Sequence, residues 1–95
     1  MKKFVLLYIG TPNKPTPEGM EKIKTWFEIL GDRIVDSGNP LMPGKEITKS
    51  GTKELPQSNE AVVGYSIINA ESVDEIEKIS KDCPTDIRVF EALPM

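Results

Sequence analysis

Two strand-like segments that are apolar on both faces limit the folds open to this chain. Residues 3–9 and 61–69 are rich in apolar and β-forming side chains, without the regular alternation of a strand that has one face in water. Such a strand needs cover on both faces of its sheet. Because the chain has 95 residues, one small domain must supply most of that cover.

Helix and strand signals alternate along the rest of the chain. Thr16 and Pro17 suit the start of a first helix, and Ser72 opens a capping box at the start of a second. The residues between the first strand and first helix, 10–15, hold one glycine and two prolines, which predicts a break. The predicted order is strand, helix, strand, strand, helix, strand, over residues 3–9, 16–31, 33–37, 61–69, 72–83 and 86–93.

The segment 41–60 is long and polar. Pro43-Gly44 favours a tight turn, and Ser50-Gly51 lies between two short runs that suit a small β-hairpin. The sequence leaves two interpretations open here, a long loop or a small hairpin insertion.

The order of elements predicts an α+β fold, with ferredoxin-like βαββαβ topology in one domain spanning residues 1–95. Right-handed crossovers would place both helices on one face of a four-stranded antiparallel sheet. The other face would then be apolar and open, which is typical of an interface. We therefore expect a homodimer through this open sheet face. The alternative is that the loop 41–57 folds across it.

Charge and composition argue against several classes of function. The net charge is −3, and Lys and Arg alternate with Asp and Glu, so a nucleic-acid partner is not expected. No run approaches the roughly 20 apolar residues of a membrane helix, and residues 3–9 lack a cleavage motif, which predicts a cytoplasmic protein without a membrane partner. One cysteine, Cys83, and no histidine exclude the usual zinc ligand sets, so neither a metal nor another cofactor is expected.

Five polar or aromatic residues are the candidates for a site near one end of the predicted sheet. Asp36 is the candidate catalytic residue, as a general base or a hydrogen-bond acceptor, with Ser37 beside it. Arg88 suits the bidentate binding of a carboxylate or phosphate. Tyr8 and Tyr65 lie on the two strongest strands and can orient a ligand through their hydroxyls.

Each candidate also has a purely structural interpretation. Asp36 and Ser37 are residue types that hydrogen-bond the local backbone in turns. Tyr8 and Tyr65 can be core aromatics whose hydroxyls reach one buried partner. Arg88 can be a charge that protects an edge strand from aggregation.

Several motifs follow one another along nearly the whole chain. They are Phe4-Val5-Leu6-Leu7-Tyr8, Val35-Asp36-Ser37-Gly38-x-Pro40-Leu41-x-Pro43-Gly44, Gly64-Tyr65-x-Ile67-Ile68-x-Ala70-x-Ser72-x-Asp74-Glu75 and Cys83-Pro84. Together they resemble the YCII-related family, particularly its DGPF-type branch. The resemblance implies a dimeric α/β-barrel fold and action on small organic molecules.

The chain departs from that family at two points. Some members carry a His–Asp pair proposed to be catalytic, but this sequence has no histidine. The Asp-Gly-Pro-Phe signature is also absent, and the corresponding stretch, 55–60, reads Leu-Pro-Gln-Ser-Asn-Glu. The resemblance therefore implies the fold more directly than it implies catalysis.

The function expected from these observations is binding of a small polar or anionic organic molecule in a pocket at one end of the sheet. Whether the protein is an enzyme is left open. One alternative is a non-catalytic regulatory or protein-interaction module that uses the loop 41–57. Another is a cofactor-free enzyme of the monooxygenase or isomerase type, which rests on fold analogy alone.

Overall fold

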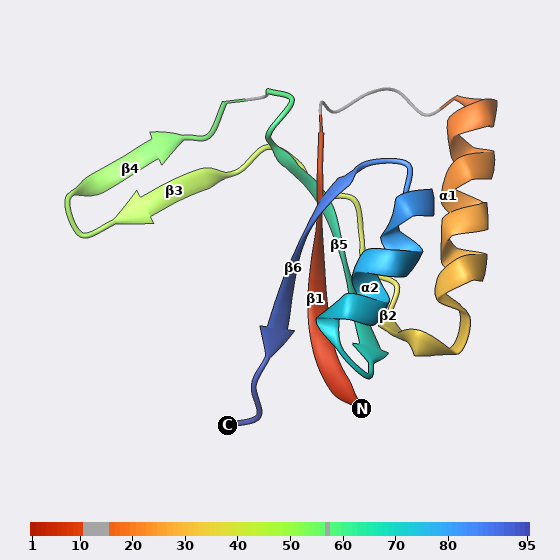
Figure 1. Cartoon of the computed structure of the whole chain (residues 1–95). Coiled ribbons are helices and arrows are strands. Elements are labelled where there is room, and N and C mark those ends of the chain that lie inside the picture. Colours follow the sequence, from red (N-terminus) through yellow and green to blue (C-terminus); the bar gives the residue numbers. More distant parts are fainter. Residues whose placement is uncertain (11–15, 57) are drawn as a thin grey trace.

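Four strands form one antiparallel sheet, and two helices cover one of its faces (Figure 1). The computed structural model describes residues 1–10, 16–56 and 58–95. The strands of this sheet are β1 (Lys2–Ile9), β2 (Ile34–Asp36), β5 (Val62–Ala70) and β6 (Asp86–Ala92), in the spatial order β2-β5-β1-β6. The predicted α+β class, with a four-stranded antiparallel sheet and two helices, is confirmed. Residues 11–15, in the predicted break, and residue 57, at the end of the predicted loop, lie outside the described residues.

The two helices begin where their capping residues predict. In α1 (Pro17–Leu30), the Thr16 hydroxyl oxygen accepts a hydrogen bond from the backbone N–H of Gly19 at 3.0 Å. In α2 (Val73–Ile79), the Ser72 hydroxyl accepts from the N–H of Glu75 at 3.3 Å. Each helix continues into a single 3₁₀ turn. The α-helical part of α2 therefore ends at Ile79, before residue 83, where the apolar pattern predicts the end.

The core lies between this helix layer and the sheet. Alternate residues of β1 and β5 face the helices and are buried, as period-two strand geometry requires. Each large apolar side chain buried here contributes about 1.5–3 kcal/mol. The buried side chains are Phe4, Leu6, Ile68 and Ala70 from the strands, and Trp26, Leu30 and Ile76 from the helices.

The opposite face of the sheet, which we call the open face, is also apolar. Val5 lies opposite Ile67 and Phe90 in the strand register, and Leu7 lies opposite Tyr65. Phe90 is 55% exposed. The described part of the chain places no helix on this face (Figure 1). A single copy of the chain therefore leaves a large apolar surface in contact with water.

Of the two interpretations of the segment 41–60, a long loop or a small hairpin, the structure contains the hairpin, which we call the arm (residues 45–54). It consists of β3 (Lys45–Thr48) and β4 (Gly51–Glu54), and the N–H of Leu55 donates to the carbonyl of Gly44 at its base, at 3.0 Å. The arm projects away from the sheet instead of lying flat along it (Figure 1). In the described residues, no helix is long and apolar enough to cross a membrane.

Candidate functional site

A cavity of about 270 Å³ lies between α1 and one end of the sheet. We call it the Tyr8 pocket. Five segments contribute to its wall: the end of β1, one side of α1, the chain directly after β2, the start of β5 and two residues that precede β6. Its lining residues are Tyr8, Ile23, Trp26, Phe27, Ser37, Gly38, Asn39, Pro40, Val63, Gly64, Tyr65, Pro84 and Thr85.

The chain after β2 is held against β5 by a conformation that needs glycine. Gly38 has φ of 80°, and its N–H donates to the Asp36 carboxylate at 2.9 Å. A Cβ atom at this position would overlap the carbonyl oxygen of Tyr65. The N–H of Tyr65 in turn donates to the carbonyl of Asn39 at 3.3 Å. This close backbone approach forms one wall of the Tyr8 pocket.

A continuous hydrogen-bond chain fixes the Tyr8 side chain. The indole N–H of Trp26 donates to the Tyr8 hydroxyl oxygen at 3.0 Å, and the Tyr8 hydroxyl donates to Ser66 Oγ at 2.8 Å. Ser66, which is fully buried, donates to the carbonyl of Ser37 at 2.7 Å. Every member therefore has a partner, which removes the cost of burying these polar groups.

Burial raises the pKa of the Tyr8 hydroxyl above its ordinary value, although its hydrogen bonds with Ser66 and Trp26 act to lower that pKa. Tyr8 is therefore a neutral phenol at physiological pH. Its single proton is engaged by Ser66, so one lone pair of its oxygen is the remaining hydrogen-bonding capacity.

The lining is aromatic and uncharged. Among the described residues that line the Tyr8 pocket, none is Asp, Glu, Lys or Arg, and four are aromatic. One of the four, Tyr65, lies opposite Leu7 in the strand register, as the residues of the open face do. Two side-chain hydrogen bonds lie along this wall: one N–H of Asn39 Nδ2 donates to the Tyr65 hydroxyl at 3.3 Å, and Thr85 Oγ1 donates to the carbonyl of Asp86 at 3.0 Å. Such a wall suits a flat, neutral ring.

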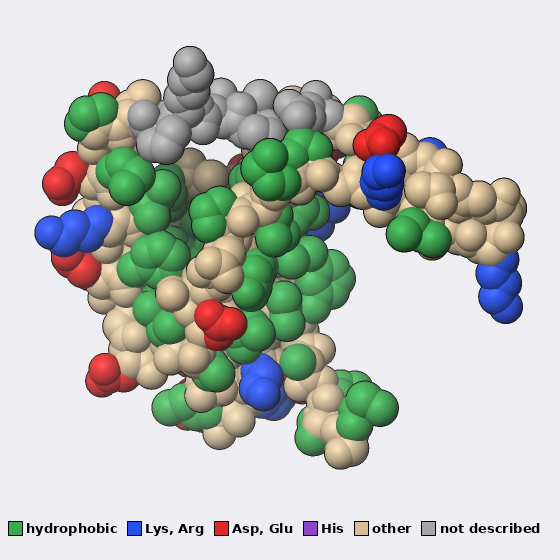
Figure 2. Space-filling model, turned by 180° about the vertical axis from the view of Figure 1, so that it is seen from behind, with side chains coloured by type: hydrophobic (Ala, Val, Ile, Leu, Met, Phe, Trp, Pro, Cys, Tyr) green, Lys and Arg blue, Asp and Glu red, His purple; other side chains and the backbone are tan. Residues whose placement is uncertain are grey.

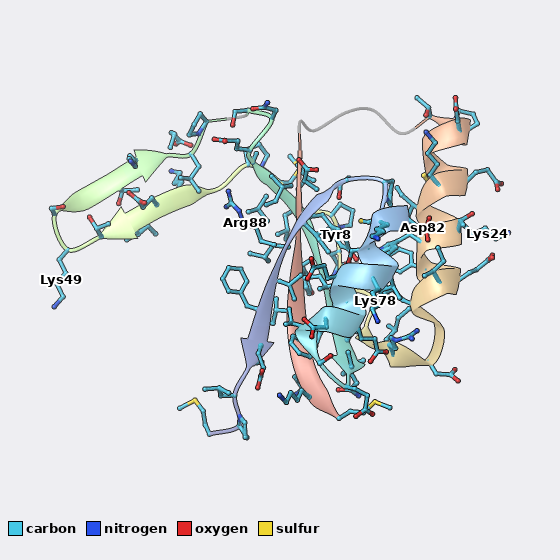
Figure 3. All side chains as sticks on the ribbon, viewed as in Figure 1. Tyr8, Lys24, Lys49, Lys78, Asp82 and Arg88 are labelled. Carbon is cyan, nitrogen blue, oxygen red and sulfur yellow. The ribbon has the colours of Figure 1, made fainter. Side chains whose placement is uncertain are left out.

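The structure brings some of the predicted site residues together and separates others. Tyr8, Ser37 and Tyr65 line the Tyr8 pocket. Asp36 is exposed and outside the lining, and its carboxylate accepts the turn hydrogen bond from Gly38. Arg88 lies opposite Leu7 on the open face, so Tyr8 and Arg88 project from opposite sides of the sheet (Figure 3).

Neither Ser66 nor Trp26 was among the five candidates from the sequence. Trp26 is buried, lines the pocket and donates to Tyr8. The signal for Ser66 was a small hydroxyl side chain inside the apolar run 61–69, because a buried hydroxyl requires a partner. Neither residue was connected to Tyr8 because the sequence does not show which strands are neighbours.

Metal ligands do not gather in the part of the chain that the structure describes, where no group of three or more Cys, Asp or Glu side chains is arranged to hold an ion. The Tyr8 pocket is thus characterised by its shape, its aromatic wall and its satisfied hydroxyl chain. No protein-family model, curated protein or solved structure matches the chain.

Proposed function

We propose that this protein binds a small, neutral, aromatic organic molecule in the Tyr8 pocket. The observation that carries the proposal is that the described lining residues are uncharged and include the aromatic side chains of Tyr8, Trp26 and Phe27. The polar or anionic ligand expected from the sequence has less support, because Arg88, the residue expected to bind the anion, lies on the open face.

The size of the cavity narrows the ligand further. An engineered protein cavity of about 150 Å³ binds benzene, so about 270 Å³ suits two fused rings. The hydrogen bonds of Tyr8 limit the choice of ligand further. The donors of Tyr8 and Trp26 already have acceptors, whereas the Tyr8 oxygen keeps one free lone pair that can accept a hydrogen bond from a ligand. A bicyclic ring that donates a hydrogen bond, such as indole, therefore meets both conditions.

The test is a thermal-shift titration with three probes: indole, 1-methylindole, which lacks the donor, and indole-5-carboxylate, which carries a negative charge. A ligand that binds only the folded state raises the unfolding midpoint. We expect the largest shift with indole, a smaller one with 1-methylindole and the smallest with the carboxylate. If none of the three probes shifts the midpoint at millimolar concentration, the proposed function is wrong.

Two substitutions on α1 test whether the ligand binds in the Tyr8 pocket. Ile23→Trp fills the Tyr8 pocket from its wall, whereas Met20→Trp places the same ring on an exposed position outside the lining. The shift with indole should disappear in the first variant and persist in the second. A shift that survives in both variants would place the ligand elsewhere on the protein.

We also propose a YCII-related, ferredoxin-like fold of the dimeric α/β-barrel type, in which two copies pack open face to open face. The order β2-β5-β1-β6 supports the ferredoxin-like topology. The exposed Phe90 beside Val5 supports the dimer. Sedimentation velocity at micromolar concentration should give the mass of two chains, and a monomer across that range would contradict the dimer.

The structure supports the two alternative functions to different degrees. A protein-interaction module has one observation in its favour, the projecting arm, which is exposed along its whole length. A cofactor-free enzyme needs a general base at the ligand, and Asp36 lies outside the lining with its carboxylate engaged by Gly38. We therefore propose binding without a reaction.

A further inference from the structure

The arm is too small to be stable without a neighbouring surface. Every residue of β3 and β4 is exposed, and Ile47, the single large apolar residue of the arm, is 77% exposed. An isolated two-stranded hairpin is marginal in water. Its two cross-strand ion pairs, Lys45–Glu54 at 3.5 Å and Lys53–Glu46 at 3.4 Å, are largely solvated, so each contributes at most about 1 kcal/mol.

The arm projects on the side of the open face. In Figure 1 the helices lie on one side of the sheet and the arm extends from its end toward the other side. The view from behind shows the resulting hollow, with hydrophobic side chains on the body of the molecule and the arm as one rim (Figure 2). A second molecule that packs on the open face would therefore lie beside the arm as well.

The length of the arm is compatible with a second sheet packed on the open face. Two sheets packed face to face lie about 10 Å apart, and the four-residue strands of the arm extend about 13 Å. Because the arm is longer than the spacing between sheets, its tip would pass the plane of the partner's sheet. Lys49 lies at the tip of the arm, at the end far from the sheet (Figure 3).

The charges are complementary between copies. The arm holds three lysines and two glutamates, a net charge of +1, and the whole chain has a net charge of −3, so the remaining residues total −4. A basic arm on an acidic body favours contact with another acidic body of the same kind.

Two arms would enlarge the interface of such a dimer. Four strands about 4.8 Å apart and about 25 Å long give the open face a flat footprint of about 500 Å², and β2 has only three residues. Stable interfaces usually bury about 800 Å² of accessible surface per partner. Contacts made by two arms would add to the area that the open face buries.

From these observations we infer that the arm of each copy lies against the other copy in a symmetric dimer, so that two arms hold the two sheets together. This inference rests on the proposed dimer through the open face. Ile47 is the apolar anchor of the arm, and its exposure in a single copy marks the surface that the partner covers.

The test compares dimer dissociation constants of the full chain by sedimentation velocity. Ile47→Asp places a charge on the arm, and replacing residues 46–53 with Gly-Gly removes most of it. Thr25→Asp is the matched control, because it adds the same charge at an exposed position of α1. Phe90→Asp reports on the open face itself.

We expect both arm variants to weaken the dimer about tenfold or more, Phe90→Asp to abolish it, and Thr25→Asp to leave it unchanged. Equal dissociation constants for the wild type and both arm variants would overturn the role of the arm while leaving the face-to-face dimer intact. A wild type that stays monomeric would overturn the dimer and, with it, the inference.

Discussion

At the scale of single residues, Gly38 decides whether the Tyr8 pocket can form. Its positive φ and its contact with the Tyr65 carbonyl both exclude a side chain. The sequence predicted a turn at this point from Asp36 and Ser37, and the turn interpretation of Asp36 describes the hydrogen bond that the structure contains. The sequence did not indicate that the turn would press against a neighbouring strand.

We predict that Gly38→Ala lowers the free energy of unfolding by about 2–3 kcal/mol, because alanine must adopt a strained φ and its Cβ displaces the backbone of β5. Urea unfolding measures the change. Gly10→Ala is the control, since its added Cβ meets no atom within 4 Å and should change the stability by less than about 0.5 kcal/mol. Equal effects of the two substitutions would show that the contact with Tyr65 is unimportant.

At the scale of the elements, an ion pair joins the 3₁₀ turn that follows α1 to the start of α2. Arg33 Nε donates to the Glu75 carboxylate at 2.7 Å, and the N–H of Glu71 donates to its second oxygen at 2.9 Å. The hydrogen bond from Arg33 lowers the pKa of Glu75 most, followed by the backbone hydrogen bond from Glu71. The sequence predicted Glu75 as part of a capping box, but its partner Arg33 is 42 positions away along the chain.

The lowered pKa of Glu75 predicts how stability depends on pH. Its stabilising contribution is present above the ordinary pKa of a glutamate, about 4.3, and is lost as the pH falls through the lower pKa of the folded state. The difference in unfolding free energy between wild type and Glu75→Gln should therefore be largest near neutral pH and shrink below about pH 4. Glu77→Gln, an exposed change on the same helix, should show no such convergence. A difference that is constant from pH 7 to pH 3 would contradict the role of the pair.

The elements themselves were the most predictable part of the structure. The four strands of the sheet and both helices begin within one residue of the positions that capping residues and apolar runs indicate. The direction in which the arm projects was not predictable. Its ten residues alternate charged and polar types with a single isoleucine, so no apolar face determines where it packs.

At the scale of the whole molecule, the candidate site divides between the two faces of the sheet. The topology placed Tyr8, Asp36 and Arg88 near one end of the sheet, but residues at one end can still project to opposite faces. Tyr8 lies opposite Ile87 and Leu7 lies opposite Arg88, so this register puts Arg88 on the face away from the helices. The sequence alone does not give the strand registers, so it does not show on which face of the sheet Arg88 lies. The molecule therefore offers two surfaces, an aromatic pocket under α1 and an open face with its arm.

The most direct test of the proposed pocket uses Trp26, which lines it and is the only tryptophan of the chain. Its indole N–H gives a single resonance in a ¹H–¹⁵N NMR spectrum, so the assignment needs no variant. On addition of unlabelled indole, that resonance should shift progressively to saturation, while the amides of the arm stay in place. A Trp26 resonance that remains unchanged at millimolar indole would contradict binding in the Tyr8 pocket.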